Sequence, residues 1–426
     1  MEHANVWTGS QRKTSTSRKT SSTDSSAAHQ AADSGADNVF LRKFSFANYA
    51  RPDIPEDHGT GIQLPSTFSP DFHDRSAVLK LRFNYVGNTG MHFSALGLGT
   101  STFGNLSDSD ELKAIDTVHT ALKCGINYIA TSPSYGNGAA EILLGKALSS
   151  VPRKTFYIGT TVGRYQEDIS KRYDFSAETV LRSVDESLAR LRLPHVDIIQ
   201  IQDAEFAPNL EVLLSETLPA LEKVVNAGKA KFIGISGYPV NFLQDVISRS
   251  SVPLDTVLSY GRYGLFNRDL KDIIPYLKEG GVGIINSAPL GMGLLSANGP
   301  ASSHPAPESL KRSAREAVAF AKERGEDLAK IAMRYCYRVP DVCTTVVNMD
   351  RPETVRETYE TCIQPMTENE NSVMHEVVKR FFLPLGRTHW ENIEVTKYWE
   401  AMENAGLVQP RPLSESEHEF HIPETN

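Results

Sequence analysis

The segment ETVLRSVDESLARLRLPHVDIIQI, residues 178–201, contains one complete helix–strand unit. The apolar residues of its first part recur every three or four positions and so share one face of a helix: Val180, Val184, Leu188 and Leu191. Its second part, Val196–Ile201, is a short and nearly all-apolar run, which is typical of a parallel strand covered by helices on both faces. The segment therefore predicts an α/β fold built on a parallel sheet.

The same alternation continues on both sides of this segment. The other predicted strands are Ala95–Gly99, Asn127–Ala130, Phe156–Thr160, Ala230–Ile235, Thr256–Ser259, Val282–Ile285 and Cys343–Val347. The other predicted helices are Asp110–Cys124, Ala139–Leu148, Leu210–Asn226, Val240–Ser248, Arg268–Glu279, Ser313–Arg324 and Thr354–Cys362. Eight such units across about 280 residues favour a (β/α)8 TIM barrel. An open, doubly wound sheet is the alternative, but no predicted strand is followed by the GxGxxG sequence that such sheets use to bind dinucleotides.

The chain divides into four regions by composition. Residues 1–38 are rich in Ser and Thr and poor in aliphatic residues, which predicts a disordered arm. Residues 39–78 carry several prolines and predict an irregular linker. Residues 79–365 form the predicted barrel, which opens with an N-terminal hairpin around Gly87-Asn88-Thr89-Gly90. Residues 366–426 form a C-terminal extension, whose aromatic residues favour docking across one mouth of the barrel.

Overall composition excludes several classes of protein. The net charge is −8, with 44 Lys and Arg against 52 Asp and Glu, so we expect no binding to nucleic acid through overall charge. There is no apolar run long enough to span a membrane, and the polar N-terminus is unlike a signal peptide. The four cysteines form no CxxC pair, so neither a disulfide framework nor a metal site is expected. These features predict a cytoplasmic protein without membrane partners.

In a barrel of this kind, the loops that follow the strands carry the chemistry. Small residues after the first strand, including Gly99 and Thr100, would let a cofactor approach the backbone. Tyr135 follows the second strand, where a phenol could donate a proton to a carbonyl. Thr161 ends the third strand region, and Gln202 follows the fourth.

Several motifs occur here in an order that resembles the aldo-keto reductases, and within them the L-galactose dehydrogenase-like branch. They are YVGNTGMHFSALGLGTSTFG (85–104), YIATSPSYG (128–136), AEILLGKAL (140–148), GKAKFIGISG (228–237) and APLGMGLL (288–295). The resemblance covers roughly residues 65 to 365. It implies NAD(P)(H)-dependent reduction of a carbonyl, or oxidation of a sugar or alcohol, without a metal. In that family a Tyr donates the proton, supported by a Lys that pairs with an Asp, and by a His that orients the carbonyl.

The catalytic positions depart from this pattern. Tyr135 matches the family's proton donor, but the expected Asp is Ala130, the expected Lys is Thr161 and the expected His is Gln202. Because both members of the Lys–Asp pair are replaced, no buried charge is left without its partner. The ionisable residues Lys146, Arg164 and Asp203 lie nearby in the sequence, but none stands at a matching position.

The resemblance also marks positions for contact with a dinucleotide. In addition to Gly99 and Thr100, they are Ser236, Gly237, Ser259, Ser287, Leu290, Gly291, Asn348 and Arg351. The Asp350 carboxylate would repel the 2′-phosphate that distinguishes NADP(H) from NAD(H), and the Arg351 guanidinium would offset this repulsion. We therefore expect NAD(H) to be accepted at least as readily as NADP(H).

Three functions remain open at this point. The first is a catalytically impaired member, or pseudoenzyme, that retains the dinucleotide and a small carbonyl or sugar as ligands and contacts a protein partner through its N-terminal arm. The second is an active oxidoreductase with Tyr135 as the proton donor. The third is a cofactor-independent binding barrel. The three replaced groups favour the first, because a phenol without a nearby cation is a poor acid near neutral pH.

Overall fold

A computed structural model describes residues 64–105 and 110–408. The predicted N-terminal arm (1–38) and the first part of the predicted linker lie outside these residues. The described end of that linker contains a short helix, α2 (Arg75–Val78), so it is not irregular throughout. The Asp74 side chain caps this helix by accepting hydrogen bonds from the backbone N–H groups of Ser76 and Ala77.

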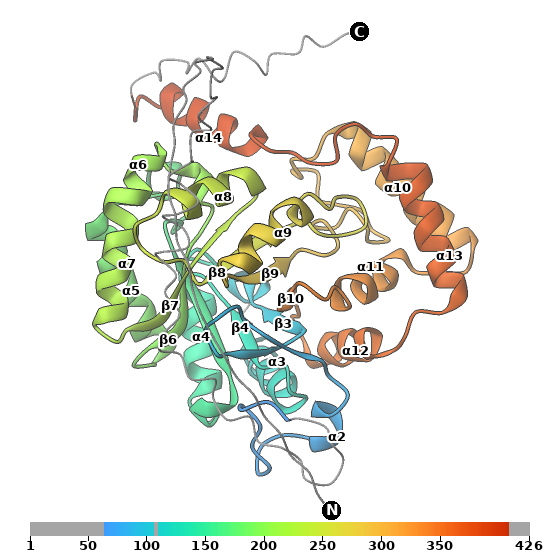
Figure 1. Cartoon of the computed structure of the whole chain (residues 1–426), viewed down its shortest axis with the longest axis horizontal. Helices are drawn as coiled ribbons and strands as arrows, with labels where there is room; N and C mark the ends of the chain where they lie inside the picture. Colours follow the sequence, from blue (N-terminus) through green and yellow to red (C-terminus); the bar gives the residue numbers. More distant parts are fainter. Residues whose placement is uncertain (1–63, 106–109, 409–426) are drawn as a thin grey trace, which may run out of the picture.

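The core of the molecule is a closed parallel barrel, as the sequence predicts (Figure 1). Its strands are β3 (Leu96–Gly99), β4 (Tyr128–Ala130), β5 (Tyr157–Val162), β6 (Val196–Ile201), β7 (Ala230–Gly237), β8 (Thr256–Tyr260), β9 (Gly283–Ser287) and β10 (Thr344–Asn348). Each strand pairs in parallel with the next, and β10 returns to pair with β3. All strands therefore end at one mouth of the barrel.

Helices surround this barrel. They are α3 (Glu111–Lys123), α4 (Ala139–Leu148), α5 (Ala177–Leu191), α6 (Leu210–Val212), α7 (Leu218–Asn226), α8 (Val240–Arg249), α9 (Leu270–Glu279), α10 (Glu308–Glu323), α11 (Leu328–Tyr337) and α12 (Pro352–Ile363). Between α6 and α7 the chain makes a π-helical turn, Leu213–Thr217, inside the predicted helix 210–226.

The sequence prediction missed α11. Its buried residues Leu328, Ile331, Ala332 and Cys336 recur every three or four positions, so this helix carries the same periodic signal as the helices that were predicted. Its start is also marked by Asp327, whose carboxylate accepts a hydrogen bond from the backbone N–H of Ala329.

The predicted N-terminal hairpin closes the mouth opposite the strand ends. Strands β1 (Phe83–Tyr85) and β2 (His92–Ser94) are antiparallel, and the turn between them lies against the start of β9. Asn88 donates its backbone N–H to the Gly281 carbonyl at 2.8 Å. Gly87 has φ +49°, and an added Cβ would lie 2.1 Å from that same carbonyl oxygen, so only glycine fits.

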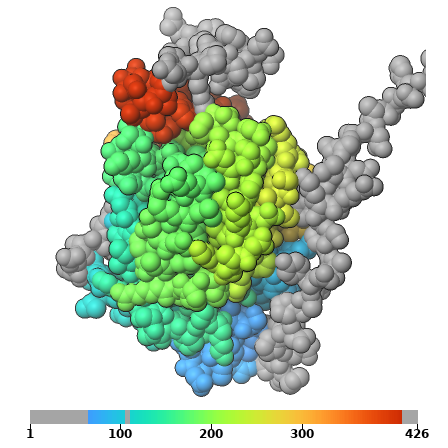
Figure 2. Space-filling model, turned by 90° about the vertical axis from the view of Figure 1, so that its left-hand side faces the viewer, coloured from blue at the N-terminus to red at the C-terminus, as the bar shows by residue number. Residues whose placement is uncertain are grey.

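The C-terminal extension continues with α13 (Glu368–Val377), a π-helical turn (Val378–Phe382) and α14 (Ile393–Asn404). In Figure 1, α13 lies beside α10 and α11, while α14 crosses the upper end of the barrel. Figure 2 shows α14, in red, on top of the green helices, with the blue N-terminal segment at the opposite end.

Trp390 anchors the extension just before α14. Its side chain is 1% exposed and stacks on Tyr238, with ring centroids 4.5 Å apart. Beside it, the buried Arg262 donates from Nη2 to Glu391 at 2.7 Å and to Asp269 at 2.6 Å. The Arg262 guanidinium also lies over the Tyr238 ring, 4.8 Å from its centroid. An aromatic stack and an ion pair thus attach the extension to the barrel.

Within residues 64–105 and 110–408, none of the helices combines the length and the apolar character that crossing a membrane would require.

We expect Trp390→Ala to lower the free energy of unfolding by about 3–5 kcal/mol, because it leaves a cavity under α14. Leu383→Ala, in the same extension but 72% exposed, should change it by less than about 0.5 kcal/mol. Urea unfolding of both variants measures the difference. Equal effects would show that the extension is not held by this anchor.

Candidate functional site

A cavity of about 330 Å³ opens at the mouth where the parallel strands end. It is lined by small, polar and aromatic residues from almost every strand end and from α14. They are Gly99, Ser101, Tyr128, Ala130, Thr131, Tyr135, Gly159, Thr161, Arg164, Gln200, Gln202, Asp203, Ser236, Leu258, Tyr260, Ser287, Ala288, Met292, Val346, Asn348 and Glu394. The four predicted catalytic positions, Ala130, Tyr135, Thr161 and Gln202, all lie in this wall.

Three of the loops form one network of neutral hydrogen bonds. The Thr161 hydroxyl donates to Gln202 Oε1 at 2.8 Å, and the Ser132 hydroxyl donates to the same oxygen at 2.5 Å. Thr161 Oγ1 and Ser132 Oγ are themselves 2.8 Å apart. All three side chains are buried. The network fills the space between β4, β5 and β6 without any ionised group.

Tyr135 stands in the turn after β4, at the edge of this network. Among the described residues, no hydrogen-bond partner reaches its hydroxyl. Burial raises the pKa of Tyr135 to about 12, and the negative charge of Asp203 adds to this, while Arg164 acts in the opposite direction. The phenol therefore holds its proton firmly throughout the neutral range.

An ion pair lies on the opposite side of Tyr135. Arg164 donates from Nη1 to Asp203 Oδ2 at 2.6 Å, and the Tyr173 hydroxyl lies 3.4 Å from the same oxygen. Asp203 has φ +50°, a left-handed conformation that turns the chain immediately after Gln202. Both charged residues face the cavity. Lys146 does not, because its ammonium group pairs with Glu111 on the outer helices, at 2.5 Å.

Glu205 is buried behind the cavity wall. Its Oε1 accepts a hydrogen bond from the backbone N–H of Tyr238 at 2.9 Å, whereas Oε2 is buried without a partner in the described structure. Burial, and then the nearby Asp203 carboxylate, raises the pKa of Glu205 to about 8. An added Cβ at Gly237 would lie 2.6 Å from Glu205 Oε2, so the glycine makes room for this carboxyl group.

Glu394 reaches the cavity from the first turn of α14 and lies at its exposed rim. Partial desolvation, and then the Asp203 carboxylate, raises the pKa of Glu394, while Arg164 acts in the opposite direction. The C-terminal extension thus contributes a carboxyl group to a site that is otherwise built from the barrel.

The predicted cofactor positions fall into two groups. Gly99, Ser236, Ser287 and Asn348 line the cavity; the others do not. Gly237 and Ser259 lie outside it because their neighbours Ser236, Leu258 and Tyr260 face inward, and side chains alternate between the two faces of a strand. Thr100 is buried and donates to the Ala130 carbonyl at 3.0 Å.

The remaining predicted positions lie in the loops after β9 and β10. Leu290 packs against both of the large apolar clusters, and Gly291 has φ +58°, where an added Cβ would lie 2.6 Å from the Phe266 ring. Arg351 is exposed before α12, with Nε 3.9 Å from Asp350.

The residues at the strand ends fit the nicotinamide end of a dinucleotide. Gly99 makes room for the Asn348 side chain, since an added Cβ would lie 2.6 Å from Asn348 Oδ1. Ser236, Ser287 and Asn348 offer hydroxyl and amide groups in the same wall, as a carboxamide requires. Within the described part of the chain, no group of three or more His, Cys, Asp or Glu side chains is arranged to hold a metal ion.

Several residues of the cavity wall were not predicted as site residues from the sequence, among them Tyr260, Met292 and Glu394. Tyr260 directly follows the predicted strand 256–259, so its place at a strand end was a usable signal. Met292 has φ +52° in the loop after β9, which no local pattern indicates. Glu394 is one of many acidic residues in the extension, and only the docking of α14 singles it out.

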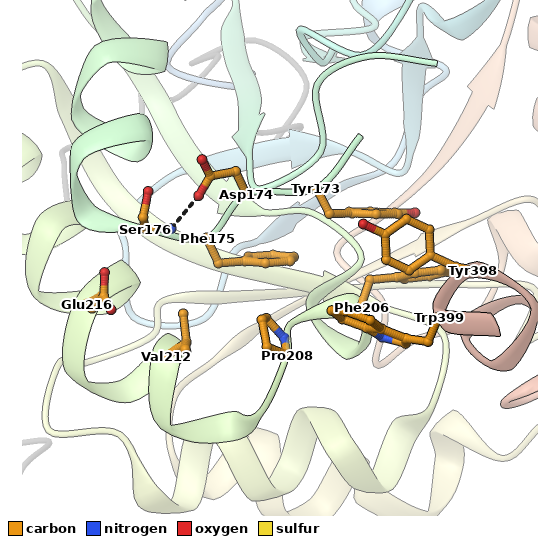
Figure 3. Close-up of a pocket in the computed structure, with 10 residues that line it drawn as sticks. All are labelled: Tyr173, Asp174, Phe175, Ser176, Phe206, Pro208, Val212, Glu216, Tyr398 and Trp399. Atoms are coloured by element: carbon orange, nitrogen blue, oxygen red, sulfur yellow. Dashed lines mark hydrogen bonds between the residues drawn. The ribbon is translucent and has the colours of Figure 1, made fainter. Parts of the chain in front are cut away.

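A second cavity, of about 250 Å³, lies between α14 and the loops after β5 and β6 (Figure 3). Tyr173 stacks on Phe206 with ring centroids 4.4 Å apart, and Tyr398 of α14 meets Tyr173 edge-on at 5.0 Å. The acidic groups here are occupied, since Asp174 accepts from the Ser176 N–H at 2.9 Å and Glu216 from the Ala177 N–H at 3.3 Å. The aromatic contacts that surround this cavity attach α14 to the loops of the barrel.

Comparison with known proteins identifies relatives for most of the chain. The model of the "Aldo/keto reductase family" matches residues 95–379, beyond the predicted barrel end at 365. L-galactose dehydrogenase of Arabidopsis thaliana is 42% identical over 287 residues, covering 65% of this chain and 87% of that protein. D-arabinose 1-dehydrogenase of Saccharomyces cerevisiae is 33% identical over 246 residues, covering 54% and 71%.

A solved aldo-keto reductase from Bacillus halodurans superimposes with a TM-score of 0.57 at 24% identity, covering 70% of this chain and 96% of that one. At this identity the likeness establishes the fold.

Glu205→Gln should flatten the pH dependence of stability. Because the folded pKa of Glu205 is about 8 and the unfolded value is about 4.3, its contribution is fully present below about pH 4.3 and is lost as the pH rises towards 8. Denaturant unfolding at a series of pH values measures this slope. Glu400→Gln, exposed on α14, serves as the control, and identical slopes for all three proteins would contradict the assignment.

The neutral cavity wall also predicts how an acidic and a basic side chain, introduced at positions 130 and 161, would affect each other's cost in stability. Ala130→Asp alone and Thr161→Lys alone each place an unpaired charge in the cavity wall and should destabilise the fold. The double variant should recover about 1–3 kcal/mol of coupling free energy, because the two positions line the same cavity on adjacent strands, Thr161 standing two residues beyond Gly159, the partner of Ala130. A double-mutant cycle from urea unfolding measures it. Strict additivity would mean that the two positions do not interact.

Proposed function

Because the chain belongs to the aldo/keto reductase family, we propose that it is a member whose barrel still binds a nicotinamide dinucleotide and a small sugar, but whose proton transfer is impaired. A bound dinucleotide would supply or accept the hydride in this family's chemistry. The residues that would lie against its nicotinamide end are Gly99, Ser236, Ser287 and Asn348.

The observation that carries the proposal is the neutral network of Thr161, Ser132 and Gln202. Proton donation by a phenol near neutral pH requires a cation or strong hydrogen bonds to lower its pKa. Here the groups between β4, β5 and β6 are hydroxyls and an amide, and the pKa of Tyr135 is raised to about 12. Loss of acid–base assistance typically slows a reaction by about 10²–10⁴-fold.

The same network supports ligand binding. The hydroxyls of Thr161 and Ser132 both donate to Gln202 Oε1, which fixes the orientation of the amide group. Gln202 Nε2 is then left to donate to an oxygen of a ligand in the cavity. A carbonyl or hydroxyl oxygen of a sugar suits this donor, in agreement with the sugar dehydrogenases among the relatives.

An active sugar dehydrogenase is the second candidate. It is favoured by the Arg164–Asp203 pair, which faces the same cavity as Tyr135 and places a cation close enough to act against the raised pKa of the phenol. In that case Tyr135 would accept the proton of the sugar hydroxyl during oxidation, or donate it to the carbonyl in the reverse reduction, with help from Arg164.

The remaining predictions concern properties outside the cavity. Acceptance of NAD(H) at least as readily as NADP(H) rests on Asp350 beside Arg351. A protein partner for the arm at residues 1–38 and a cytoplasmic location remain predictions from the sequence.

The proposal is tested by titrating the full chain with NADH and NADPH. Saturable binding and thermal stabilisation are expected, with little oxidation of L-galactose or D-arabinose in the presence of NAD⁺ or NADP⁺. The triple variant Ala130→Asp, Thr161→Lys, Gln202→His should oxidise these sugars at least about 100-fold faster, because it restores the ionisable groups that lower the pKa of the Tyr135 phenol.

Tyr135→Phe in the triple variant provides the control and should abolish the gained activity. Rapid turnover by the unaltered chain that is lost in Tyr135→Phe would contradict the proposal that proton transfer is impaired. It would favour the second candidate, an active sugar dehydrogenase.

A further inference from the structure

The main cavity is completed by a residue from outside the barrel. Glu394 lies at its rim, in the first turn of α14. It stands four residues after Trp390, which is buried against Tyr238, and four residues before Tyr398, which is buried against Tyr173 and Phe206. With an aromatic anchor on each side, the position of this carboxylate is held relative to the barrel.

The charges that face the cavity do not balance. Arg164 is neutralised by Asp203, to which it donates at 2.6 Å, so this pair adds little net charge. Glu394 makes no salt bridge within the described residues, and the cations that act on it, Arg164 and Lys397, lie beyond ion-pair distance. Glu205 lies behind the cavity wall and is itself a carboxyl group, so it cannot balance the negative charge of Glu394. The rim of the cavity at Glu394 is therefore acidic.

We propose that Glu394 is a specificity-determining residue, which makes this cavity select neutral polyhydroxylated ligands over their carboxylate-bearing counterparts. The inference rests on the proposed function, since it assumes that the cavity binds a sugar. It assigns to the C-terminal extension a direct part in recognition, in addition to covering the mouth.

The chemistry follows from the donor and acceptor inventory of the site. A carboxylate only accepts hydrogen bonds, and its two oxygens can receive two hydroxyl groups of a sugar. Other residues of the same cavity wall supply groups that can donate, the Gln202 amide and the phenols of Tyr135 and Tyr260. A neutral polyol, which both donates and accepts, matches both sides, whereas an acid anion meets repulsion at the rim.

The size of the effect is set by solvent exposure. Two like charges several ångströms apart at a hydrated rim interact weakly, and salt screens them over about 8–10 Å. We therefore expect a discrimination of roughly three- to tenfold from Glu394 alone, which decreases as the ionic strength rises.

The test is calorimetric binding of L-galactose and of its acid anion, L-galactonate, to the full chain in the presence of NADH. Unaltered protein should bind the neutral sugar more tightly. Glu394→Gln, which keeps the shape of the side chain, should shift the ratio of the L-galactose and L-galactonate affinities by roughly three- to tenfold in favour of L-galactonate. Raising the salt concentration should reduce the discrimination only while Glu394 is present.

Glu400→Gln is the matched control, because it removes the same charge from an exposed position of the same helix that does not line the cavity. It should leave both affinities unchanged. Equal shifts in Glu394→Gln and Glu400→Gln would overturn the inference, since the effect would then come from the overall field of α14.

The outcomes separate this inference from the proposed function. If the unaltered chain binds L-galactose and Glu394→Gln changes neither affinity, the inference fails while the proposed function stands. If the chain turns over sugars rapidly but Glu394→Gln shifts selectivity as expected, the proposal of impaired proton transfer fails while the inference about Glu394 stands. Binding of neither sugar nor dinucleotide overturns both.

Discussion

Pairing of β10 with β3 is the constraint on which the rest of this structure depends. It joins strands about 250 residues apart and closes the sheet, with Asn348 opposite Gly99 at the end of the register. Once the parallel sheet is closed, every strand must end at the same mouth. Residues from separate loops, such as Tyr135, Thr161 and Gln202, are thereby brought into one cavity. The hairpin around Gly87 closes the opposite mouth, so access is from the strand ends.

Within that cavity, the balance between neutral and charged groups determines the chemistry. Burying an ionised group is costly unless a partner is buried with it, and the space between β4, β5 and β6 avoids this cost by using hydroxyls and an amide. Of the charged residues in the cavity wall, Arg164 and Asp203 are paired with one another, while Glu394 comes from α14. The proposal that proton transfer from Tyr135 is impaired rests on this distribution of neutral and charged groups.

The extension changes the site as well as covering it. Trp390 and Tyr398 are buried at either end of the segment that carries Glu394, and Arg262 ties this segment to the barrel through Glu391. Such a segment can vary without disturbing the strands, because its contacts lie on the loops. One barrel fold can serve many ligands when the segments around its mouth differ, and the segment from Trp390 to Tyr398 is such a segment in this chain.

Local sequence determined the barrel. Apolar strands of about five residues, alternating with amphipathic helices such as residues 178–191, leave few other ways to bury both faces of a sheet. The resemblance to known motifs also predicted Ala130, Tyr135, Thr161 and Gln202 as positions of one site, and the structure places all four in one cavity wall at or near the strand ends. The helix α11 was missed although its buried residues Leu328, Ile331, Ala332 and Cys336 have helical spacing, so its absence from the prediction does not reflect a lack of local signal.

Tertiary structure alone decided which groups meet. No sequence pattern relates Ser132 to Thr161 and Gln202, nor Glu394 to Arg164, because these contacts arise from strand register and from the docking of a distant helix. The pleat of β8 likewise turned Tyr260 into the cavity and Ser259 out of it. Hydrogen bonds and electrostatic interactions depend on separations of a few ångströms, and only the folded chain sets these distances between residues far apart in sequence.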